Sequence, residues 1–166
     1  MEIGLLFYPQ YQVVNMVEGR VIENDIDLNK IVDHLARHAH EGMGAIVIFI
    51  GFVKGDIDGK KVSRLDYSVY EPYTSKKLEE IASEEMEEGI YDIKIFHKYG
   101  NLDVGDKTLY IIVGAKGRKK GFEKAIKVLE RVKFEPPIFK LEHREDGEYW
   151  VFGDGTRLKR ESRDVR

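Results

Sequence analysis

The chain has 166 residues, of which 42% are hydrophobic and 34% are charged, values typical of one globular domain with a buried core rather than of a disordered or fibrous chain. Its net charge of −3 excludes a general positive field that would attract nucleic acid or an anionic membrane, so any anion site must be a local cluster. It contains no cysteine, which excludes disulfides, thiolate nucleophiles and zinc sites with sulfur ligands.

The first predicted helix begins at Leu28 after Asp27, which is a plausible N-cap, and its apolar residues recur at helical spacing as far as Ala39. Residues 1–20 before it form an N-terminal extension of unclear role, and its short apolar patch lacks a basic leader. No apolar run reaches the length of a membrane span, so we expect a cytoplasmic protein that binds no membrane. Three histidines near the helix end have no carboxylate or cysteine to complete a metal set, and no metal site is predicted (His34, His38 and His40).

Residues 44–53, read GAIVIFIGFV, are almost continuously apolar and β-branched, which predicts a central strand covered on both faces. A loop opens at Lys54 and contains the turn Asp58-Gly59. The alternating residues 62–70 predict a half-buried strand. A helix capped by Thr74 and closed by Gly89 follows it.

Two further strands are predicted at residues 93–99 and 107–115, with a turn at 101–106 between them. The segment 116–120 then places four cations in five residues at the start of a helix, where free backbone N–H groups add to the side-chain charge. This pattern predicts a site for one phosphate. Contact with nucleic acid is the alternative, but no aromatic stacking platform lies beside the cations and the net charge opposes it.

The segment 132–142, read VKFEPPIFKLE, places Lys133 and Lys140 on either side of two prolines. Because each proline fixes its own φ and disfavours a helical conformation before it, the helix must end near Phe134 and the chain must continue as a strand. Alternation puts Lys140 on one face of that strand together with Ile138 and Glu142. Partial desolvation among apolar neighbours lowers the pKa of such a lysine. The alternative is that both lysines are ordinary surface cations.

Residues 149–152 form a last predicted strand, and residues 153–166 are polar, mixed in charge and expected to be a mobile tail. Helices and strand pairs alternate along the chain, which predicts a single α+β domain over residues 1–166, with helices layered on a largely antiparallel sheet. The sequence has no GxGxxG or phosphate-loop motif, which argues against nucleotide hydrolysis or a dinucleotide cofactor.

Taken together, these motifs resemble the large, catalytic subunit of molybdopterin synthase, over residues 21–151. They occur in the order of that family: GAIVIFIGFVKG, YEPYTSKKLEEIA, HKYGNLDVGD, GRKKGFEKAI and VKFEPPIFKLEHREDGEYWV. The last is the most specific, because its two lysines are seven residues apart around a proline turn, as in the family.

The resemblance implies an α/β-hammerhead fold with an added antiparallel β subdomain, and a homodimer within a heterotetramer. Each large subunit binds a small ubiquitin-like carrier whose C-terminal Gly-Gly ends in a thiocarboxylate. Sulfur passes from two such thiocarboxylates to cyclic pyranopterin monophosphate and forms the dithiolene of molybdopterin. The partner brings the sulfur, which agrees with the absence of cysteine, and no cofactor is expected.

By position, Lys133 and Lys140 match the two active-site lysines of the family. Arg118 matches an arginine that the family supplies across the dimer interface. The other residues that match substrate-binding stretches are Phe52, Val53, Lys54, Gly117, Leu141 and Glu142. The chain departs from the family where Gly117 replaces a usual histidine, Lys54 a usual arginine and Phe139 a usual tryptophan. The departures at Gly117 and Lys54 leave a first alternative function, a non-catalytic scaffold that still binds the carrier. A second alternative is a nucleic-acid-binding domain that uses residues 116–120.

Overall fold

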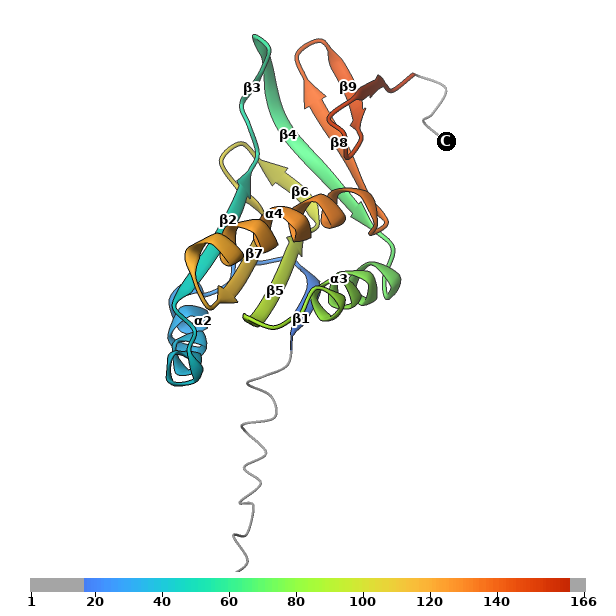
Figure 1. The fold of residues 1–166 in the computed structure, drawn as a ribbon. Helices are drawn as coiled ribbons and strands as arrows, with labels where there is room; N and C mark the ends of the chain where they lie inside the picture. The colour runs from blue at the N-terminus through green and yellow to red at the C-terminus, as the bar shows by residue number, and fades with distance from the viewer. Residues whose placement is uncertain (1–16, 162–166) are drawn as a thin grey trace, which may run out of the picture.

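The computed structural model describes residues 17–161, which form two β-sheets with three α-helices (Figure 1). The strands are β1 (Glu18–Ile22), β2 (Ala45–Phe52), β3 (Asp56–Ile57), β4 (Lys60–Val69), β5 (Ile90–Lys98), β6 (Gly100–Asp103), β7 (Lys107–Ala115), β8 (Ile138–Arg144), β9 (Gly147–Val151) and β10 (Arg157–Lys159). The helices are α2 (Leu28–Leu35), the 3-10 helix η1 (Ala36–Glu41), α3 (Tyr73–Glu84) and α4 (Arg118–Phe134). The expected α+β class is confirmed.

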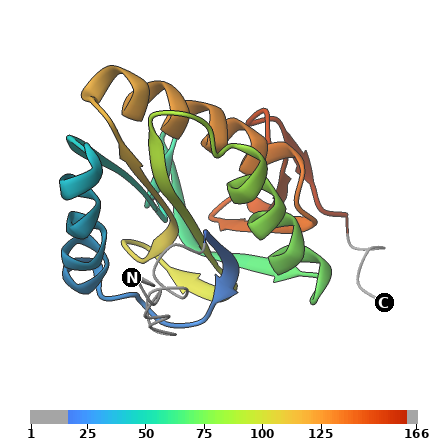
Figure 2. The same cartoon turned by 60° about the horizontal axis from the view of Figure 1, so that its bottom comes forward.

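The first sheet has the order β1-β5-β7-β2, with β1 parallel to β5 and the other pairs antiparallel. Almost every residue of β5 and β7 is buried, because helices cover both faces of these two strands. Helices α3 and α4 lie on one face (Figure 2). They bury a large apolar cluster that includes Leu78, Ile95 and Val128. On the other face α2 packs its apolar stripe near Phe96 and Tyr110.

The second sheet has the order β10-β9-β8-β4-β3, and β6 also pairs with β4. It rises beyond the end of the first sheet, where the β8–β9 hairpin stands clear of the helices (Figure 1). A small apolar cluster, Val53, Leu65, Tyr67 and Leu102, packs where the two sheets meet. This junction lies beneath the strand that carries Lys140.

The helix predicted to start at Leu28 does so, and the Asp27 carboxylate accepts the Lys30 N–H at 3.2 Å as the expected N-cap. Two predictions for the next helix are wrong. The N-cap of α3 is Pro72, so Thr74 lies inside the helix. Gly89, with φ +84°, lies in the turn before β5 and not at the helix end, which is Glu84.

The prediction that residues 44–53 form a central, doubly covered strand is wrong. Strand β2 is the last strand of its sheet and pairs only with β7 among the described residues. None of its side chains is fully buried, and Ile48 and Phe52 are 36% and 54% exposed. An exposed apolar edge strand is a surface that can pair with another chain.

Four short strands were not predicted. Strand β1 begins within the supposed N-terminal extension, β3 lies in the predicted loop after Lys54, β6 takes up the first part of the predicted turn, and β10 lies within the supposed tail. The remaining expectations for residues 1–16 and 162–166 fall outside the described residues, and mobility of the tail stays a prediction. Within residues 17–161, no helix is long and apolar enough to cross a membrane.

Candidate functional site

The proline turn is held in place by the start of α3. Helix α4 ends at Phe134 as predicted, and β8 begins at Ile138. The Thr74 hydroxyl donates to the Pro137 carbonyl oxygen at 2.9 Å and accepts the Tyr70 N–H at 2.8 Å. These bonds join the turn to the segment between β4 and α3. They therefore fix the direction in which β8 leaves and the side on which Lys140 projects.

Lys140 lies half-buried on the face of β8 that was predicted for it. It pairs directly with Tyr67 of β4 on one side and with Val151 of β9 on the other. Its Nζ is 6.0 Å from the centre of the Tyr67 ring, and that ring meets the His97 ring edge-on at a centroid distance of 4.9 Å. Two aromatic rings thus shield the lysine amine from water on its inner side.

The electrostatic environment of Lys140 favours its uncharged form. Burial is the largest cause that lowers the pKa of the amine, and the nearby charges of Arg157, Lys133 and Lys54 lower it further. The Glu142 carboxylate acts in the opposite direction. The structure therefore brings both predicted lysines and Lys54 into one electrostatic neighbourhood.

The ring stack below Lys140 is neutral. Burial lowers the pKa of His97 to about 4, with the charge of Lys140 contributing. The Nδ1 atom of His97 lies 2.7 Å from the Lys98 carbonyl oxygen, which can only accept, so Nδ1 carries the proton. Burial likewise raises the pKa of Tyr67 to about 12. Neither ring takes up or loses charge near neutral pH.

The Glu142 side chain is only 2% exposed, and its partners are arginines. The Arg157 guanidinium donates from Nε at 3.0 Å and from Nη2 at 3.4 Å to the two carboxylate oxygens. The Nη1 atom of Arg144 lies 3.7 Å from one of these oxygens. Glu142 is thus held within the protein and faces Arg157.

Lys133 is exposed on the last turn of α4. The turn between β9 and β10 packs against its backbone, because a Cβ atom at Gly153 would come within 2.3 Å of the Lys133 carbonyl oxygen. The exposed ring of Phe134 lies beside the same glycine. The amine of Lys133 remains free to meet a ligand at the edge of the site.

The other predicted pocket residues differ in what they can offer. Phe52 and Lys54 are exposed and have side chains free for contact. Val53 is 2% exposed, and Leu141 is 5% exposed on the opposite face of β8 from Lys140. These two residues can reach a ligand only through their backbone.

Gly117 and Arg118 lie at the opposite end of α4 from Lys133. Fifteen residues of helix separate Arg118 from Lys133, which is roughly 22 Å. Their surroundings form a hollow of about 730 Å³ whose lining includes Lys116, Lys119 and Lys120. One chain therefore does not bring Arg118 to Lys140.

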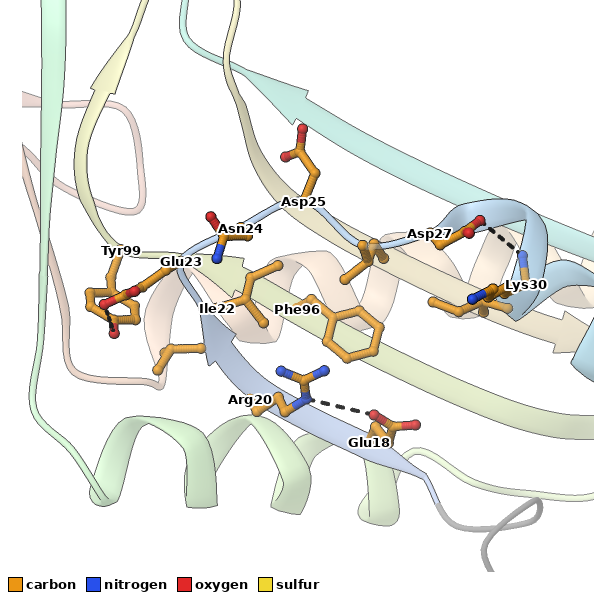
Figure 3. A pocket seen from close by; sticks show the side chains of 13 residues that line it. Glu18, Arg20, Ile22, Glu23, Asn24, Asp25, Asp27, Lys30, Phe96 and Tyr99 are labelled. Carbon is orange, nitrogen blue, oxygen red and sulfur yellow. Dashed lines mark hydrogen bonds and ion pairs between the residues drawn. The ribbon is translucent and has the colours of Figure 1, made fainter.

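A second hollow, of about 650 Å³, lies between β1 and the start of α2 (Figure 3). Arg20 lies over the Phe96 ring at 5.0 Å, and the Tyr99 hydroxyl donates to Glu23 at 2.6 Å. No residue predicted for the site lines it. Across residues 17–161, no group of three or more histidine, aspartate or glutamate side chains is placed to hold a metal ion.

Tyr67, His97 and Arg157 belong to the site but were not predicted for it. Tyr67 lies on β4 and His97 on β5, and only the packing of the two sheets puts both rings under Lys140. A signal for Arg157 was present. The pair Asp154-Gly155 stands between two strand-like runs, which is a typical hairpin pattern.

Comparison with known proteins gives a consistent picture. A family model described as MoaE protein matches residues 21–135. The molybdopterin synthase catalytic subunit of Pyrococcus abyssi is 34% identical over 135 residues, which are 81% of this chain and 90% of that protein. The protein of the same name from Bacillus subtilis is 40% identical over 110 residues, 65% of this chain and 69% of that protein.

Solved structures agree with the sequence matches. Molybdopterin synthase from Staphylococcus aureus superposes with a TM-score of 0.68 at 30% identity, over 80% of this chain and 95% of that chain. A complex of subunits 1 and 2 of the molybdopterin-converting factor from Helicobacter pylori gives a TM-score of 0.61 at 19% identity, over 87% of this chain and 90% of that chain. The second likeness is one of fold.

Proposed function

The chain belongs to the MoaE protein family, whose members include molybdopterin synthase catalytic subunits, and we propose that Lys133 and Lys140 carry its sulfur-transfer reaction. The observation that supports this assignment is the half-buried Lys140 amine, which shares one neighbourhood with Lys133 and Lys54. Cations converging there suit an anionic substrate, cyclic pyranopterin monophosphate. A lysine with a lowered pKa gives up its proton more readily than an exposed lysine does, which suits a proton donor or acceptor.

The proposed reaction begins with the thiocarboxylate at the C-terminus of a small carrier protein. Its sulfur forms a bond to a carbon of the pterin substrate while a carbon–oxygen bond at that carbon breaks and the oxygen leaves with the electron pair, so that the carrier becomes joined through a thioester. Water then attacks the acyl carbon, the acyl–sulfur bond breaks, and the carrier leaves with a free carboxylate while the sulfur remains on the pterin. Lys133 would stabilise the negative charge that develops on the acyl oxygen and on the departing sulfur, and Lys140 would exchange a proton with the reacting groups.

The surface beside the lysines suits the Gly-Gly tail of such a carrier. Phe134 and Phe152 are 61% and 53% exposed, and both lie next to Gly153. A tail without side chains can pass between exposed aromatic rings at little steric cost. The complex from Helicobacter pylori contains two subunits of molybdopterin-converting factor, and we assign the carrier as the corresponding partner of this chain.

A second copy of this chain would complete the site. Arg118 lies at one end of α4 and the lysines at the other, while β2 runs beside α4 with an open, apolar edge. Gly44, which precedes β2, lies against Lys116 near the start of α4, and Lys54 follows the other end of the strand. Antiparallel pairing of two β2 edges would bring Arg118 of one copy toward Lys54 and Lys140 of the other.

We also propose an assignment for the two sheets. The first sheet with its helices corresponds to an α/β-hammerhead, and the second sheet corresponds to the added antiparallel subdomain. We treat the chain as one domain that acts in the cytoplasm. The two copies and two carriers would form the heterotetramer.

The test combines the purified chain with a thiocarboxylated carrier and cyclic pyranopterin monophosphate. We expect dithiolene product from the wild type and at least a hundredfold loss in Lys133→Ala, because the charge on the acyl group is no longer stabilised. Lys127→Ala on the same helix is the matched control, since its exposed amine pairs with Glu85 instead. Unchanged turnover in Lys133→Ala would refute the role of that lysine.

The scaffold alternative rests on two substitutions, Gly117 and Lys54. Lysine cannot grip a phosphate with two parallel hydrogen bonds as arginine does. A scaffold would bind the carrier and release no product under the same conditions. The reaction above therefore separates the two functions directly.

A further inference from the structure

We propose that Arg157 is a positioning residue that holds the Glu142 carboxylate, so that this carboxylate is not the counterion of the Lys140 amine. The inference rests on the proposed function, in which Lys140 exchanges a proton. It concerns a residue of β10, which lies beyond the part of the chain that the family model matches, residues 21–135.

The sheet places Arg157 in line with Lys140. Lys140 pairs directly with Val151 of β9, and Val151 pairs directly with Arg157 of β10. Because directly paired residues project from the same face of an antiparallel sheet, the two cationic side chains share one face. Their Cα atoms are two strand spacings apart, about 10 Å, a distance that both long side chains can shorten.

Glu142 lies on that same face, two residues from Lys140 along β8. Its carboxylate could pair with either cation, and the structure gives it to Arg157, with both oxygens bonded. The side chain of Glu142 is 2% exposed, whereas that of Arg157 is 27% exposed. A planar guanidinium matches both carboxylate oxygens at once, which a lysine amine cannot do.

The remaining groups around Lys140 do not replace this arrangement. Lys133 from α4 and Lys54 after β2 are cations whose charges lower the pKa of Lys140 less than the charge of Arg157 does. Tyr67 from β4 and His97 from β5 are neutral rings. Arg144 approaches Glu142 at 3.7 Å, but it is engaged by Asp146 at 2.6 Å and 2.8 Å. Arg157 is therefore the main charged group that opposes the effect of Glu142 on the pKa of Lys140.

The segment that supplies Arg157 is itself fixed to the site. Gly153, four residues before Arg157, packs on the Lys133 carbonyl. The Arg157 Nη1 atom also donates to the Gly155 carbonyl oxygen at 3.1 Å, which braces the guanidinium within its own turn. One short hairpin thus contacts the helix end that carries Lys133 and the carboxylate beside Lys140.

The experiment measures the reactivity of the Lys140 amine without turnover. The full chain is labelled with acetic anhydride at a series of pH values, and the labelling rate of Lys140 is followed by peptide mass spectrometry. In Arg157→Gln, a positive charge is lost and Glu142 is released, and both changes stabilise the ammonium form. We expect the Lys140 profile to move to higher pH, with a labelling rate at pH 8 about three- to tenfold below that of the wild type.

Three further variants exclude a general loosening of the hairpin. Arg157→Lys should restore part of the wild-type rate, and Glu142→Gln in the Arg157→Gln background should return the profile toward lower pH. Arg160→Gln is the matched control, since it removes an arginine that pairs with Glu148 at 3.0 Å, and it should leave the profile unchanged. An unchanged profile in Arg157→Gln, or a shift that persists in the double variant, would overturn the proposal.

Failure of the proposed function would look different. In that case no variant, nor the wild type, would form dithiolene product, although the labelling profile of Lys140 would still move as expected. If the wild type forms product and the profile does not respond to Arg157, the function stands and the role of Arg157 falls.

Discussion

At the scale of single residues, the site shows how a common surface residue becomes chemically useful. Lys140 alternates into a strand face where Tyr67 and His97 exclude water on one side. Since desolvation penalises the ammonium form, the amine reaches its neutral state at a lower pH than an exposed lysine does. Lys133 lies on the other side of the two prolines and is exposed to solvent. The two lysines thus suit different tasks.

The direction of the Lys140 shift predicts the pH dependence of the reaction. If the neutral amine is the working form, the single-turnover rate should rise with pH and level off below the pH at which an exposed lysine titrates. Lys140→Arg should remove this rise, because an arginine stays charged throughout. The measurement is the single-turnover rate from pH 6 to pH 10. A rate that falls over this range would contradict the assignment.

Gly117 offers a second test at the residue scale. Its φ is −154°, which any residue adopts, and a Cβ atom there would meet nothing within 4 Å. Gly117→His should therefore fold normally and place an imidazole beside Arg118. We expect a severalfold lower KM for the pterin substrate, about the effect of one added hydrogen bond to a phosphate. Gly117→Ala is the control, and an equal KM in both variants would show that the imidazole adds nothing.

At the scale of elements, α3 and α4 are joined by charge as well as by apolar packing. Glu85, just past the end of α3 and 5% exposed, receives Lys124 at 3.2 Å, Lys127 at 3.2 Å and Arg131 at 3.3 Å, all from α4. Burial alone would raise the pKa of Glu85, but the bonds from Lys127 and Lys124 outweigh it and leave the pKa lowered. This cluster fixes the helix that presents Lys133.

Removal of that carboxylate should destabilise the protein. In Glu85→Ala, the nearly buried Lys124 loses one of its partners, and we expect about 2–4 kcal/mol lower free energy of unfolding at pH 7. Because the pKa of Glu85 is lowered by folding, the difference from the wild type should be full above pH 4.5 and shrink as the pH falls below it. Urea unfolding at several pH values measures this. Glu88→Ala, at an exposed position, is the control and should change stability by less than about 0.5 kcal/mol.

The elements that could be predicted from sequence are those with local signals. The cation cluster at residues 116–120 predicted the start of α4, and the two prolines predicted its end near Phe134. The strands β1 and β6 have five residues or fewer and are stabilised by partners far along the chain, which periodicity does not report. Strand β10 has three residues, pairs with the neighbouring β9 and is too short to show alternation. In the site, the lysines were found by their spacing and resemblance. Arg157 was missed because its role depends on a hairpin within a polar stretch.

At the scale of the whole molecule, the wrong prediction that β2 is a central strand is informative. Continuous apolar sequence normally indicates a strand covered on both faces, yet β2 lies at the edge of its sheet with Ile48 and Phe52 exposed. In the proposed dimer the second copy would cover this edge, which would account for the apolar sequence of β2. Phe122 and Ile126 of α4, 60% and 62% exposed, are further apolar side chains that a partner could cover. These features favour an assembly in which single chains are incomplete.

Ile48 tests where the second copy binds. Ile48→Lys should place a charge on the proposed β2 edge and shift the protein from dimer to monomer in light scattering, because a desolvated lysine opposes pairing. Ser63→Lys, at an exposed position on β4 in the other sheet, should leave the dimer intact. A dimer that persists in Ile48→Lys would place the interface elsewhere.

Complementation between inactive variants tests whether the copies share sites. Arg118→Ala and Lys133→Ala should each be inactive as homodimers. When they are mixed and allowed to exchange, half of the dimers become mixed, and each mixed dimer has one site with Arg118 from one copy and Lys133 from the other. Product formation should therefore recover to about a quarter of the wild-type rate per chain. If both residues served the same chain's site, every site in the mixture would carry one defect, and no activity would return.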